Sequence, residues 1–371
     1  MLHRLYTDLH AEHWWLAWLR HTVPDQIRPQ GLKRLLARRL PLELRNRLVR
    51  DFPVRTLAMR CVSGSHADIT STMLRYLRSL SWTSDDIIYS VLINADVELL
   101  AELKVRGVQV VHECMISPDV GSWIAEERKL WPGVETGDPV AEVEQGRRRD
   151  QAKYELADLI LAPSEFARAG VRALGADPSK IVVVPYGLDF RRFDLKNARP
   201  QPGRVLTVGE VSLRKGTHYL SQAVQILRNR GHKFDFRVAG ALSPRIEDAK
   251  AFAGPTYLGA VPRPSMAQEF MSADVFVLPT LAEGSALAHV EALAHGLPVI
   301  TTPNCGAVIR DGVEGFIVPI RDPHALADRI EQIVTDRELR QQLSINAAAR
   351  AREFSLEKYA SRLLQAVDRL R

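Results

Sequence analysis

The stretch Leu278-Pro-Thr-Leu-Ala-Glu-Gly-Ser-Ala-Leu-Ala-His-Val-Glu-Ala-Leu-Ala-His-Gly-Leu-Pro-Val-Ile-Thr-Thr302 is the most informative part of this chain. An apolar run, Val275–Leu278, leads into a turn that carries Glu283-Gly284-Ser285. A helical pattern over Ala286–His295 and a second apolar run, Pro298–Thr301, follow. Short continuous apolar runs of this kind are typical of buried parallel strands. The stretch therefore predicts one strand–helix–strand unit of a parallel α/β sheet.

The same alternation extends to both sides of this unit. In the C-terminal half, further strands are expected at Val205–Val208, Phe234–Ala239 and Thr256–Leu258, with helices at Thr217–Arg228 and Ser265–Ser272. Nearer the N-terminus, strands are expected at Thr56–Cys61, Asp86–Leu92, Val108–His112, Leu159–Ala162 and Ile181–Pro185, with helices at His66–Ser79, Val97–Arg106 and Glu165–Leu174. Alternating strands and helices imply a parallel sheet with helices on both faces.

Two such regions are separated by Asp189–Gly203, an irregular stretch with two prolines that predicts a linker. A length of 371 residues also exceeds what a single hydrophobic core usually organises. The sequence therefore predicts two doubly wound α/β domains in series, whose ligands bind at the carboxyl ends of the strands. The last expected elements are helices at Pro323–Thr335, Asp336–Phe354 and Ser355–Arg371, with Ser355 as an N-cap.

Composition and charge exclude several classes of protein. The three cysteines are too few and too scattered for a disulfide framework or a zinc site, which favours a reducing, cytoplasmic location. No uncharged apolar run approaches the ~20 residues of a membrane span, and Arg4, Asp8 and Glu12 interrupt any signal-peptide pattern. The net charge of the whole chain is +6, and residues 1–60 carry +7. The other residues therefore carry a net charge of −1. A nearly neutral body argues against nucleic-acid binding.

Two carboxylates of the opening stretch have positions that suit ligand chemistry. Glu283 precedes the N-terminus of the expected helix, where backbone N–H groups and the helix dipole attract anions such as a sugar or nucleotide phosphate. Glu291 lies two turns into that helix among apolar neighbours, where an acid needs a partner, and a ribose would be one. The alternative is a solvated loop acid and a water-facing helix acid. The spacing and the strand–turn–helix context favour the functional pair.

A second segment, Val205–Leu220, carries two cations after an expected strand. Arg214 and Lys215 lie on the loop, and Gly216 opens the next helix. Two cations at the carboxyl edge of a sheet suit a diphosphate, which Arg grips with a planar fork and Lys neutralises as a point charge. A solvated basic turn is the alternative, and only the combination with the carboxylate pair makes this signal strong.

Together the two segments resemble the donor half of the family-4 (group 1) glycosyltransferases, whose GT-B fold consists of two facing Rossmann-like domains. Glu283…Glu291 matches the family's E-x7-E motif, and Arg214-Lys215-Gly216 matches its R/K-K-G loop. The resemblance covers roughly residues 85–371. Three further stretches resemble the family's A-D-x-I-x-x-x-S-E-F, P-N-G-V-D and G-G…D-G-x-x-G motifs, namely Ala157–Phe166, Val184–Asp189 and Asn304–Phe316.

The resemblance implies a role for each residue of the two segments. Glu291 is expected to hydrogen-bond the ribose of the donor nucleotide, and Glu283 to contact the donor sugar near its anomeric carbon. Arg214 and Lys215 are expected to neutralise the leaving diphosphate. The start of the helix is expected to add donor contacts at Ser285, Ala286 and Leu287.

His112 ends an expected strand where the family often places a histidine near the transferred sugar. It is expected to donate a hydrogen bond to a sugar hydroxyl or to act as an acid–base group; a structural histidine is the alternative, which geometry decides. The family also implies retention of the anomeric configuration. The sequence lacks an Asp-x-Asp triplet, and cations with a helix terminus can stabilise a leaving diphosphate. Neither a metal nor another cofactor is therefore expected.

The sequence departs from the family in three places. Glu210 follows Gly209, where many relatives have another phosphate-binding Arg, and Tyr186 replaces the usual Asn of P-N-G-V-D. The chain also starts without the family's first strand, Gly-rich loop and helix, so Leu2–Thr7 is expected to correspond to the second strand. A divergent subfamily and a start site inside the true reading frame are the two hypotheses for this N-terminal domain.

Residues 14–50 combine tryptophans with a basic helical pattern. Leucines recur at helical spacing over Leu32–Leu40 with Lys and Arg on the flanks, and Trp14, Trp15 and Trp18 precede them. Such a segment suits an anionic membrane surface, which would place the protein peripherally on the inner face of the membrane. The alternative is a helical hairpin that packs its Leu face on the sheet, and the interruption at Pro41 favours this alternative.

The sequence thus predicts a glycosyltransferase that moves a hexose from a nucleotide sugar to a hydroxyl of a glycan or lipid-linked acceptor. The expected domains are an acceptor-side domain, 1–198, a nucleotide-sugar-binding domain, 199–353, and a C-terminal helix, 354–371, that returns to the first. A non-catalytic carbohydrate- or nucleotide-binding relative is the rival from another class. A dinucleotide dehydrogenase is disfavoured because no G-x-G-x-x-G follows an expected strand.

Overall fold

The computed structural model describes residues 5–6, 49–50, 74–75, 77–90, 97–137, 140–190, 199–306 and 308–370. The chain divides into two compact units, Met1–Asp86 with Leu92–Val108 and Ile87–Val91 with Gln109–Arg371. All the predicted site residues belong to the second unit. Within the described ranges, no helix is both long and apolar enough to cross a membrane.

The described part of the first unit contains two short strands, helical residues at 74–75 and 77–78, and one complete helix. β1 (Leu5–Tyr6) pairs in parallel with β2 (Val49–Arg50), and α5 (Val97–Val105) buries three leucines. β1 falls inside the strand expected at Leu2–Thr7. β2 occupies the last two residues of the basic segment 14–50, beyond the leucines at helical spacing. Three expectations lie outside the described residues: the strand Thr56–Cys61, most of the helix His66–Ser79, and residues 14–48.

A four-stranded parallel sheet in the order β3-β4-β5-β6 lies in the second unit. Its strands are Ile87–Ser90, Gln109–Glu113, Leu159–Ala162 and Ile181–Val183. They confirm the expected strands to within a few residues. Helix α8 (Glu165–Ala173) and the 3-10 turn η3 (Pro178–Lys180) connect β5 to β6.

Two helices between β4 and β5 were not expected. They are α6 (Val120–Leu130) and α7 (Val140–Leu156). Neither has an apolar stripe: Glu127 is the buried residue of α6, and Lys153 and Tyr154 are those of α7. Helices without a periodic apolar face give no hydrophobic signal in a sequence.

The second sheet of this unit has six parallel strands in the order β12-β11-β10-β7-β8-β9. Five of its strands confirm the expected ones, and β12 (Gly315–Ile317) was missed because three residues after a turn give too short an apolar run. The other strands are β7 (Arg204–Val208), β8 (Asp235–Ala239), β9 (Thr256–Gly259), β10 (Val275–Leu278) and β11 (Val299–Thr301).

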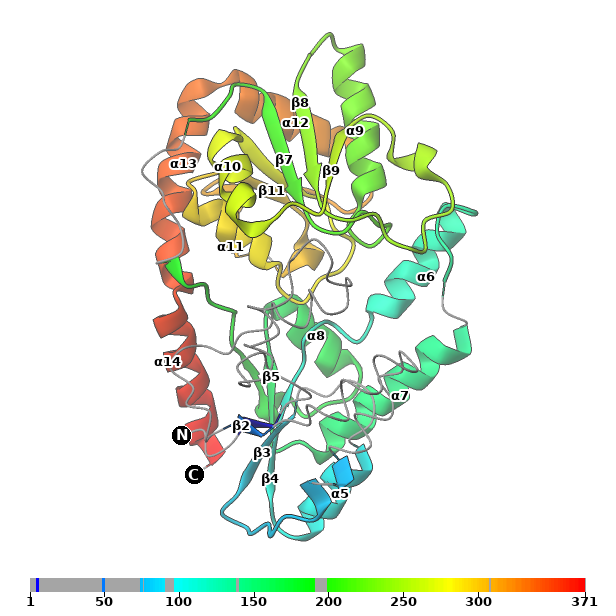
Figure 1. Cartoon of the computed structure of the whole chain (residues 1–371), viewed down its shortest axis with the longest axis vertical. Helices are drawn as coiled ribbons and strands as arrows, with labels where there is room; N and C mark the ends of the chain where they lie inside the picture. Colours follow the sequence, from blue (N-terminus) through cyan, green and yellow to red (C-terminus); the bar gives the residue numbers. More distant parts are fainter. Residues whose placement is uncertain are drawn as a thin grey trace, which may run out of the picture. The chain divides into compact units, whose positions relative to one another are not determined.

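Helices cover both faces of the six-stranded sheet because side chains alternate along its buried strands. Val275 and Val277 pack with α9 (Thr217–Asn229) and α12 (Pro323–Thr335), whereas Phe276 and Leu278 belong to the core under the opposite helices. Figure 1 shows the helices on either side of these strands. The opposite helices are α10 (Arg263–Ser272), α11 (Leu287–Ala294) and α13 (Arg337–Ala351).

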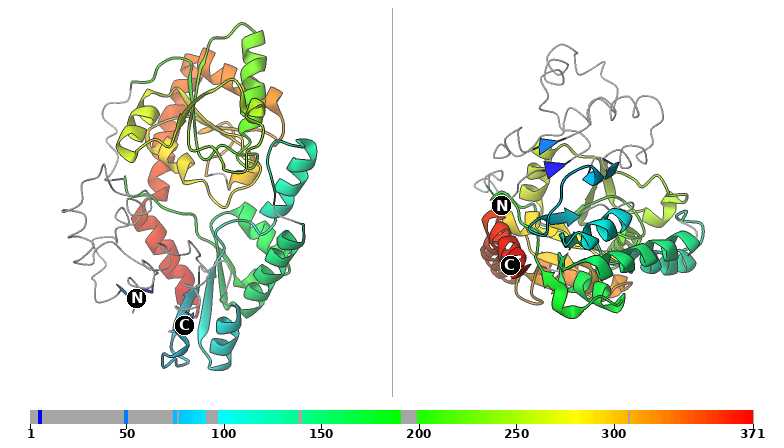
Figure 2. Two further views of the ribbon diagram at one scale, coloured as in Figure 1. Left: turned by 45° about the vertical axis from the view of Figure 1, so that its right-hand side comes forward. Right: turned by 90° about the horizontal axis from the view of Figure 1, so that it is seen from below.

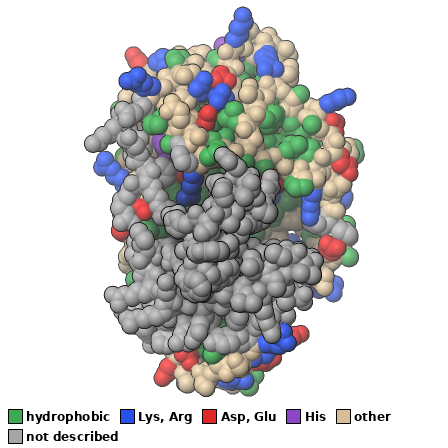
Figure 3. Space-filling model, in the orientation of Figure 1, with side chains coloured by type: hydrophobic (Ala, Val, Ile, Leu, Met, Phe, Trp, Pro, Cys, Tyr) green, Lys and Arg blue, Asp and Glu red, His purple; other side chains and the backbone are tan. Residues whose placement is uncertain are grey.

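The last α-helix, α14 (Leu356–Val367), packs on the four-stranded sheet (Figures 1 and 2) and is followed by the 3-10 turn η9 (Asp368–Leu370). The hydroxyl of Ser355 accepts from the N–H of Lys358 at 3.3 Å, which confirms the expected N-cap. Basic and acidic side chains of the described residues are interspersed on the face drawn in Figure 3. This distribution agrees with the nearly neutral charge of the chain beyond residue 60.

Candidate functional site

Glu283 lies on the loop between β10 and α11, and neighbouring loops hold that loop through its backbone. The N–H of Glu283 donates to the carbonyl of Asn304 at 2.9 Å, and the amide of Asn304 donates to the carbonyl of Leu281 at 2.9 Å. The N–H of Leu281 donates to the carbonyl of Arg214 at 2.8 Å. The loops after β7, β10 and β11 are thereby joined at the carboxyl edge of the sheet, where such folds bind ligands.

Three motifs that are distant in the sequence meet at Gly284. The hydroxyl of Ser164, from the A-D…S-E-F stretch, donates to the carbonyl of Gly284 at 2.6 Å. A Cβ at Gly284 would lie 1.9 Å from the carbonyl oxygen of Met115, and a Cβ at Gly306 would lie 2.4 Å from that of Gly284. Only glycine fits this junction, which fixes the backbone on the C-terminal side of Glu283.

The buried carboxylate of Glu283 binds both cations of the loop after β7. Arg214 Nη1 forms an ion pair with Glu283 Oε1, and Lys215 Nζ lies 2.5 Å from the same oxygen. Arg214 Nη1 also donates to the carbonyl of Ala282 at 3.3 Å. The carboxylate expected at the donor sugar and the expected diphosphate-binding cations therefore form one cluster, in which one negative charge offsets part of two positive charges.

The cation loop ends at Gly216, the N-cap of α9, whose φ of 69° is left-handed. A Cβ at this position would lie 1.9 Å from the carbonyl oxygen of Pro279 on the loop that carries Glu283. Gly216 therefore lets the two functional loops approach each other.

We expect Gly216→Ala to lower the free energy of unfolding by about 3 kcal/mol, because a left-handed alanine costs about 1–2 kcal/mol and its methyl group must also displace the Pro279 backbone. Gly312→Ala is the control, since Gly312 has a similar φ of 73° and nothing within 4 Å of its Cβ position. Urea unfolding measures both variants. An equal loss in the two would show that the close approach to Pro279 has no energetic weight.

The start of α11 offers backbone donors next to Glu283. Ala286 is the N-cap, with φ −77° and ψ 102°, and no side chain caps the helix. The first N–H groups of a helix have no partner inside it and attract anions. Ser285 is half-buried, Ala286 is buried and Leu287 is 40% exposed. The structure thus brings the three predicted positions together at the edge of the cluster.

Glu291 lies in the middle of α11 and is half-buried. Among the described residues, no hydrogen bond or ion pair to its carboxylate is formed. Burial raises the pKa of Glu291, and the charge of Arg263 opposes that shift. A partly desolvated carboxylate with unused acceptor oxygens is suited to hydroxyl donors such as those of a ribose.

His112 lies within β4 and is buried, with its ring centroid 5.6 Å from that of Tyr154. Three residues further along, Met115 contacts the Gly284 junction. His112 is thus at the expected strand end, and its catalytic role stays a prediction. Tyr186, in place of the family's Asn, packs edge-on against Tyr359 of α14 at 6.2 Å.

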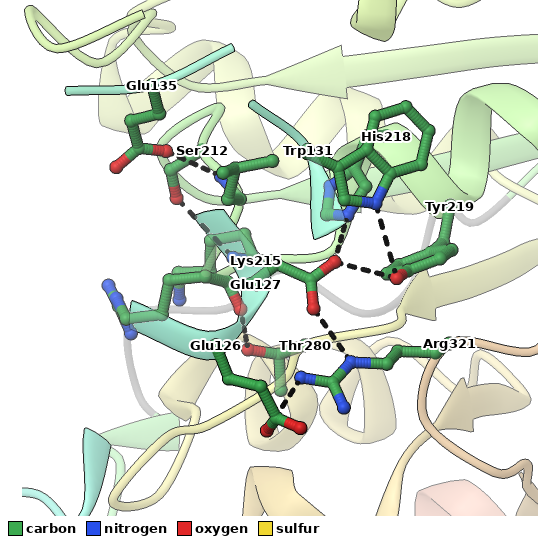
Figure 4. Close-up of polar contacts among 12 residues, drawn as sticks. Glu126, Glu127, Trp131, Glu135, Ser212, Lys215, His218, Tyr219, Thr280 and Arg321 are labelled. Atoms are coloured by element: carbon green, nitrogen blue, oxygen red, sulfur yellow. Dashed lines mark hydrogen bonds and ion pairs between the residues drawn. The ribbon is translucent and has the colours of Figure 1, made fainter. Parts of the chain in front are cut away.

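A buried carboxylate network, which sequence reasoning missed, joins α6 to the six-stranded sheet's domain (Figure 4). Glu127 is fully buried; its Oε1 lies 2.9 Å from His218 Nε2 and accepts from the Tyr219 hydroxyl at 2.6 Å. Its Oε2 accepts from Arg321 Nε at 2.7 Å. Burial alone would raise the pKa of Glu127, but the three hydrogen bonds outweigh burial, and the pKa of Glu127 is lowered. Burial lowers the pKa of His218. We therefore assign an ionised Glu127 and a neutral His218.

The loop between α6 and α7 extends the same attachment. Val134 belongs to the core of the six-stranded sheet, and Glu135 accepts from the N–H of Leu213 at 2.8 Å. The N–H of Thr136 donates to the carbonyl of Arg245 at 2.9 Å. The only sequence signal in this region is a run of charges at 126–129, which is more typical of a solvated helix face than of a buried anchor.

His289, on α11, is a buried histidine without a role in the predicted site. Neither of its ring nitrogens has a hydrogen-bond partner among the described residues, and its ring meets Phe276 edge-on at 5.8 Å. Burial, with a contribution from Lys215, lowers the pKa of His289 to about 3. The folded protein therefore keeps this ring neutral, whereas the unfolded chain protonates it below about pH 6.5.

We expect His289→Leu to raise the free energy of unfolding by about 1–2 kcal/mol at pH 7, because it removes an unsatisfied buried polar group. The wild type should lose stability as the pH falls from 7 to 5, since its unfolded state then binds more protons, and the variant should lose less. Denaturant melts at the two pH values measure this. His324→Leu, at an exposed position, is the control; an equal gain there would refute the interpretation.

Comparison with known proteins gives one family match. Residues 202–336 match the family model described as glycosyl transferases group 1. Two of the curated relatives are a D-inositol 3-phosphate glycosyltransferase of Paenarthrobacter aurescens, 31% identical over 245 residues (59% of this chain, 60% of the relative), and a putative colanic acid biosynthesis glycosyltransferase of Salmonella typhimurium, 28% identical over 198 residues (49% of each). The chain thus spans about half to 60% of the length of these relatives.

Solved structures agree on the fold. Sucrose-phosphate synthase of Thermosynechococcus elongatus superposes with a TM-score of 0.66 at 21% identity, covering 83% of this chain and 79% of that one. Anabaena HepE in complex with UDP superposes with a TM-score of 0.61 at 16% identity, covering 81% and 82%. The arrangement of two parallel-sheet, Rossmann-like domains is therefore the GT-B fold, as the motifs predicted.

Proposed function

The chain is related to the group 1 glycosyltransferases through its C-terminal domain, and from this premise we propose that it transfers a hexosyl group from a nucleoside-diphosphate sugar to a hydroxyl of a glycan or lipid-linked acceptor. The observation that carries the proposal is the cluster of Glu283, Arg214 and Lys215 beside the uncapped start of α11. The cluster combines a carboxylate that can accept hydrogen bonds from sugar hydroxyls with positive groups that can bind a diphosphate. Solved relatives bound to UDP and to UDP-glucose support this donor class.

In this proposal the donor lies along the carboxyl edge of the six-stranded sheet. Its ribose hydroxyls donate to the carboxylate of Glu291, which has acceptor capacity to spare. Its diphosphate replaces Glu283 as the partner of Arg214 and Lys215, with the N–H groups at Ser285–Leu287 on its other side. Glu283 then accepts from hydroxyls of the sugar.

The chemical step breaks the bond between the anomeric carbon and the β-phosphate oxygen, and the electron pair leaves with the nucleoside diphosphate. The acceptor oxygen bonds to that carbon, and its proton passes to the departing phosphate oxygen. Arg214, Lys215 and the start of α11 stabilise the charge that develops on the leaving group. These groups act without a metal in our proposal, and the anomeric configuration is retained. His112 assists as a hydrogen-bond donor to the sugar.

The test is release of nucleoside diphosphate from UDP-, GDP- and ADP-hexoses, with the donor chosen by the largest ligand-induced rise in melting temperature. We expect Glu291→Ala to weaken donor binding by about tenfold or more, because it removes hydrogen bonds to a charged acceptor. Glu338→Ala, an exposed acid on α13, is the control. Donor binding without any release would instead favour the non-catalytic relative. NMR of the glycoside product reports the anomeric configuration.

The nature of the acceptor also bears on where the protein acts, since a lipid-linked acceptor places the reaction at a membrane surface. We propose a cytoplasmic protein. Contact of residues 14–50 with the inner membrane face is the alternative to a helical hairpin packed on the sheet, and only Val49–Arg50 of this segment are described. Co-sedimentation with anionic vesicles at low salt tests the contact, and a protein that stays in the supernatant would remove it.

A further inference from the structure

A cavity of about 320 Å³ lies among α6, α7 and the loops that follow β7 and β8. This volume falls at the lower end of the range of small-molecule sites and suits a single sugar unit. Three arginines from three different elements line it: Arg128 from α6, Arg214 from the loop after β7, and Arg245 from the loop after β8.

The cavity adjoins the ion pair of Arg214 and Glu283. Arg214 lines the cavity and forms the ion pair with Glu283. A ligand in the cavity would therefore be separated from Glu283 by one guanidinium group. The cavity is thus next to the position where the proposed function places the transferred sugar.

Arg128 is the residue whose bonding points to a ligand. Its side chain is only 17% exposed, and its Nη2 forms an ion pair with Glu135 Oε1 at 3.6 Å, a separation longer than a hydrogen bond. Its Nε is buried and has no hydrogen-bond partner among the described residues. Buried donors in proteins nearly always have a partner. A guanidinium group with unused donors on the wall of a cavity matches the planar geometry of an oxyanion.

Two carboxylates, Glu135 and Glu210, also line the cavity, and they do not cancel the preference of Arg128 for an oxyanion. Glu135 divides its carboxylate between two partners, because its Oε2 accepts from the N–H of Leu213 and its Oε1 pairs with Arg128. Glu210 is exposed to solvent. The arginines therefore outnumber the acids around the cavity. The donor's own diphosphate does not explain Arg128, because Arg214, Lys215 and the start of α11 are assigned to it.

We propose that this cavity is the acceptor subsite and that it receives a sugar unit bearing an oxyanion, either a carboxylate or a phosphate, which binds to Arg128. The identification of this ligand as the acceptor rests on the proposed function. The acidic character of the ligand rests on the cavity and on Arg128. Such an acceptor makes the protein a transferase that extends an acidic saccharide.

Binding is measured without donor by saturation-transfer NMR, using methyl β-D-glucuronide, glucose 6-phosphate and methyl β-D-glucoside as probes. We expect the wild type to bind at least one acidic probe about tenfold or more tightly than the neutral glucoside, and the stronger of the two identifies carboxylate or phosphate. Arg128→Ala should abolish that preference and Arg128→Lys should restore part of it. Arg148→Ala, on α7 with a 78% exposed side chain, should keep the wild-type preference.

Equal binding of all three probes by the wild type, no binding at all, or a preference that survives in a folded Arg128→Ala would each overturn the proposal. Circular-dichroism melts establish that each variant is folded. In the transfer assay, a rise in the donor KM of Arg128→Ala equal to that in the acceptor KM would place the donor, rather than the acceptor, in the cavity. Because the binding test omits donor, it remains decisive if no nucleoside diphosphate is released, and that result would count against the proposed function alone.

Discussion

Glu283→Gln is expected to slow glycosyl transfer by about 100-fold or more while binding the nucleoside diphosphate about tenfold more tightly than the wild type, an effect equivalent to ~1.4 kcal/mol. The loss follows from removing the charge that we place beside the transferred sugar. The gain follows from the ion pairs of Glu283 with Arg214 and Lys215, because the diphosphate no longer competes with a carboxylate for these cations. Single-turnover rates and calorimetric titration with the diphosphate measure the two effects.

The opposite signs of these effects make the prediction specific. Glu338→Gln, at an exposed position of α13, should change neither quantity. Lys215→Ala should weaken diphosphate binding instead, since it removes a cation rather than its competitor. If Glu283→Gln weakens diphosphate binding, then Glu283 contacts the diphosphate side directly, and our assignment of the carboxylate to the sugar is wrong.

The second large effect is expected at Glu127, for which alanine should cost about 3–5 kcal/mol of the free energy of unfolding. The substitution leaves Arg321 without its buried counterion and His218 and Tyr219 without their acceptor. Denaturant melts followed by tryptophan fluorescence measure the loss, since Trp131 lies 4.9 Å from the ring of His218. A loss below about 1 kcal/mol would show that the network contributes little.

Glu126→Ala is the matched control, because Glu126 neighbours Glu127 on α6 and binds the same arginine at 3.1 Å but is 56% exposed. Exposed ion pairs contribute about 0–1 kcal/mol. The pH dependence has a definite sign. Glu127 has a lowered pKa, so its contribution is present above the pKa of the unfolded chain and is lost as the pH falls. His218 also has a lowered pKa and adds its own loss on acidification. Glu127→Ala should remove only the part of the acid loss that Glu127 itself contributes, because Glu127 raises the pKa of His218 and its removal lowers that pKa further.

The parts of the fold that the sequence predicts are those with a strong local pattern. Continuous apolar runs located the buried strands. The positions of Glu283 before α11 and of Glu291 within it were predictable because their spacing spans one strand–turn–helix unit, and the roles of both residues stay predictions. Ser355 was predictable as a cap because a hydroxyl residue before a helix satisfies its free N–H groups.

The parts that the sequence does not predict depend on contacts between distant segments. Nothing local distinguishes Glu127 from the exposed Glu126 beside it, and only His218 and Arg321, about 90 and 190 residues further along the chain, make the first of the two a buried anchor. The pairing of Glu283 with the loop cations is of the same kind. The motifs identified all three residues, but they did not predict that Glu283 pairs with both cations.

The attachment of the α6–α7 loop has a consequence for engineering. Val134 completes the core of the six-stranded sheet, and Glu127 and Glu135 bind residues around its cation loop. A chimera that exchanged residues 199–353 for the equivalent part of a homologue, in order to change donor preference, would retain an anchor shaped for the original domain. A successful graft would also have to include residues 120–137. The part of this protein that can be exchanged as a unit therefore consists of two segments, 120–137 and 199–353, which are separated in the gene.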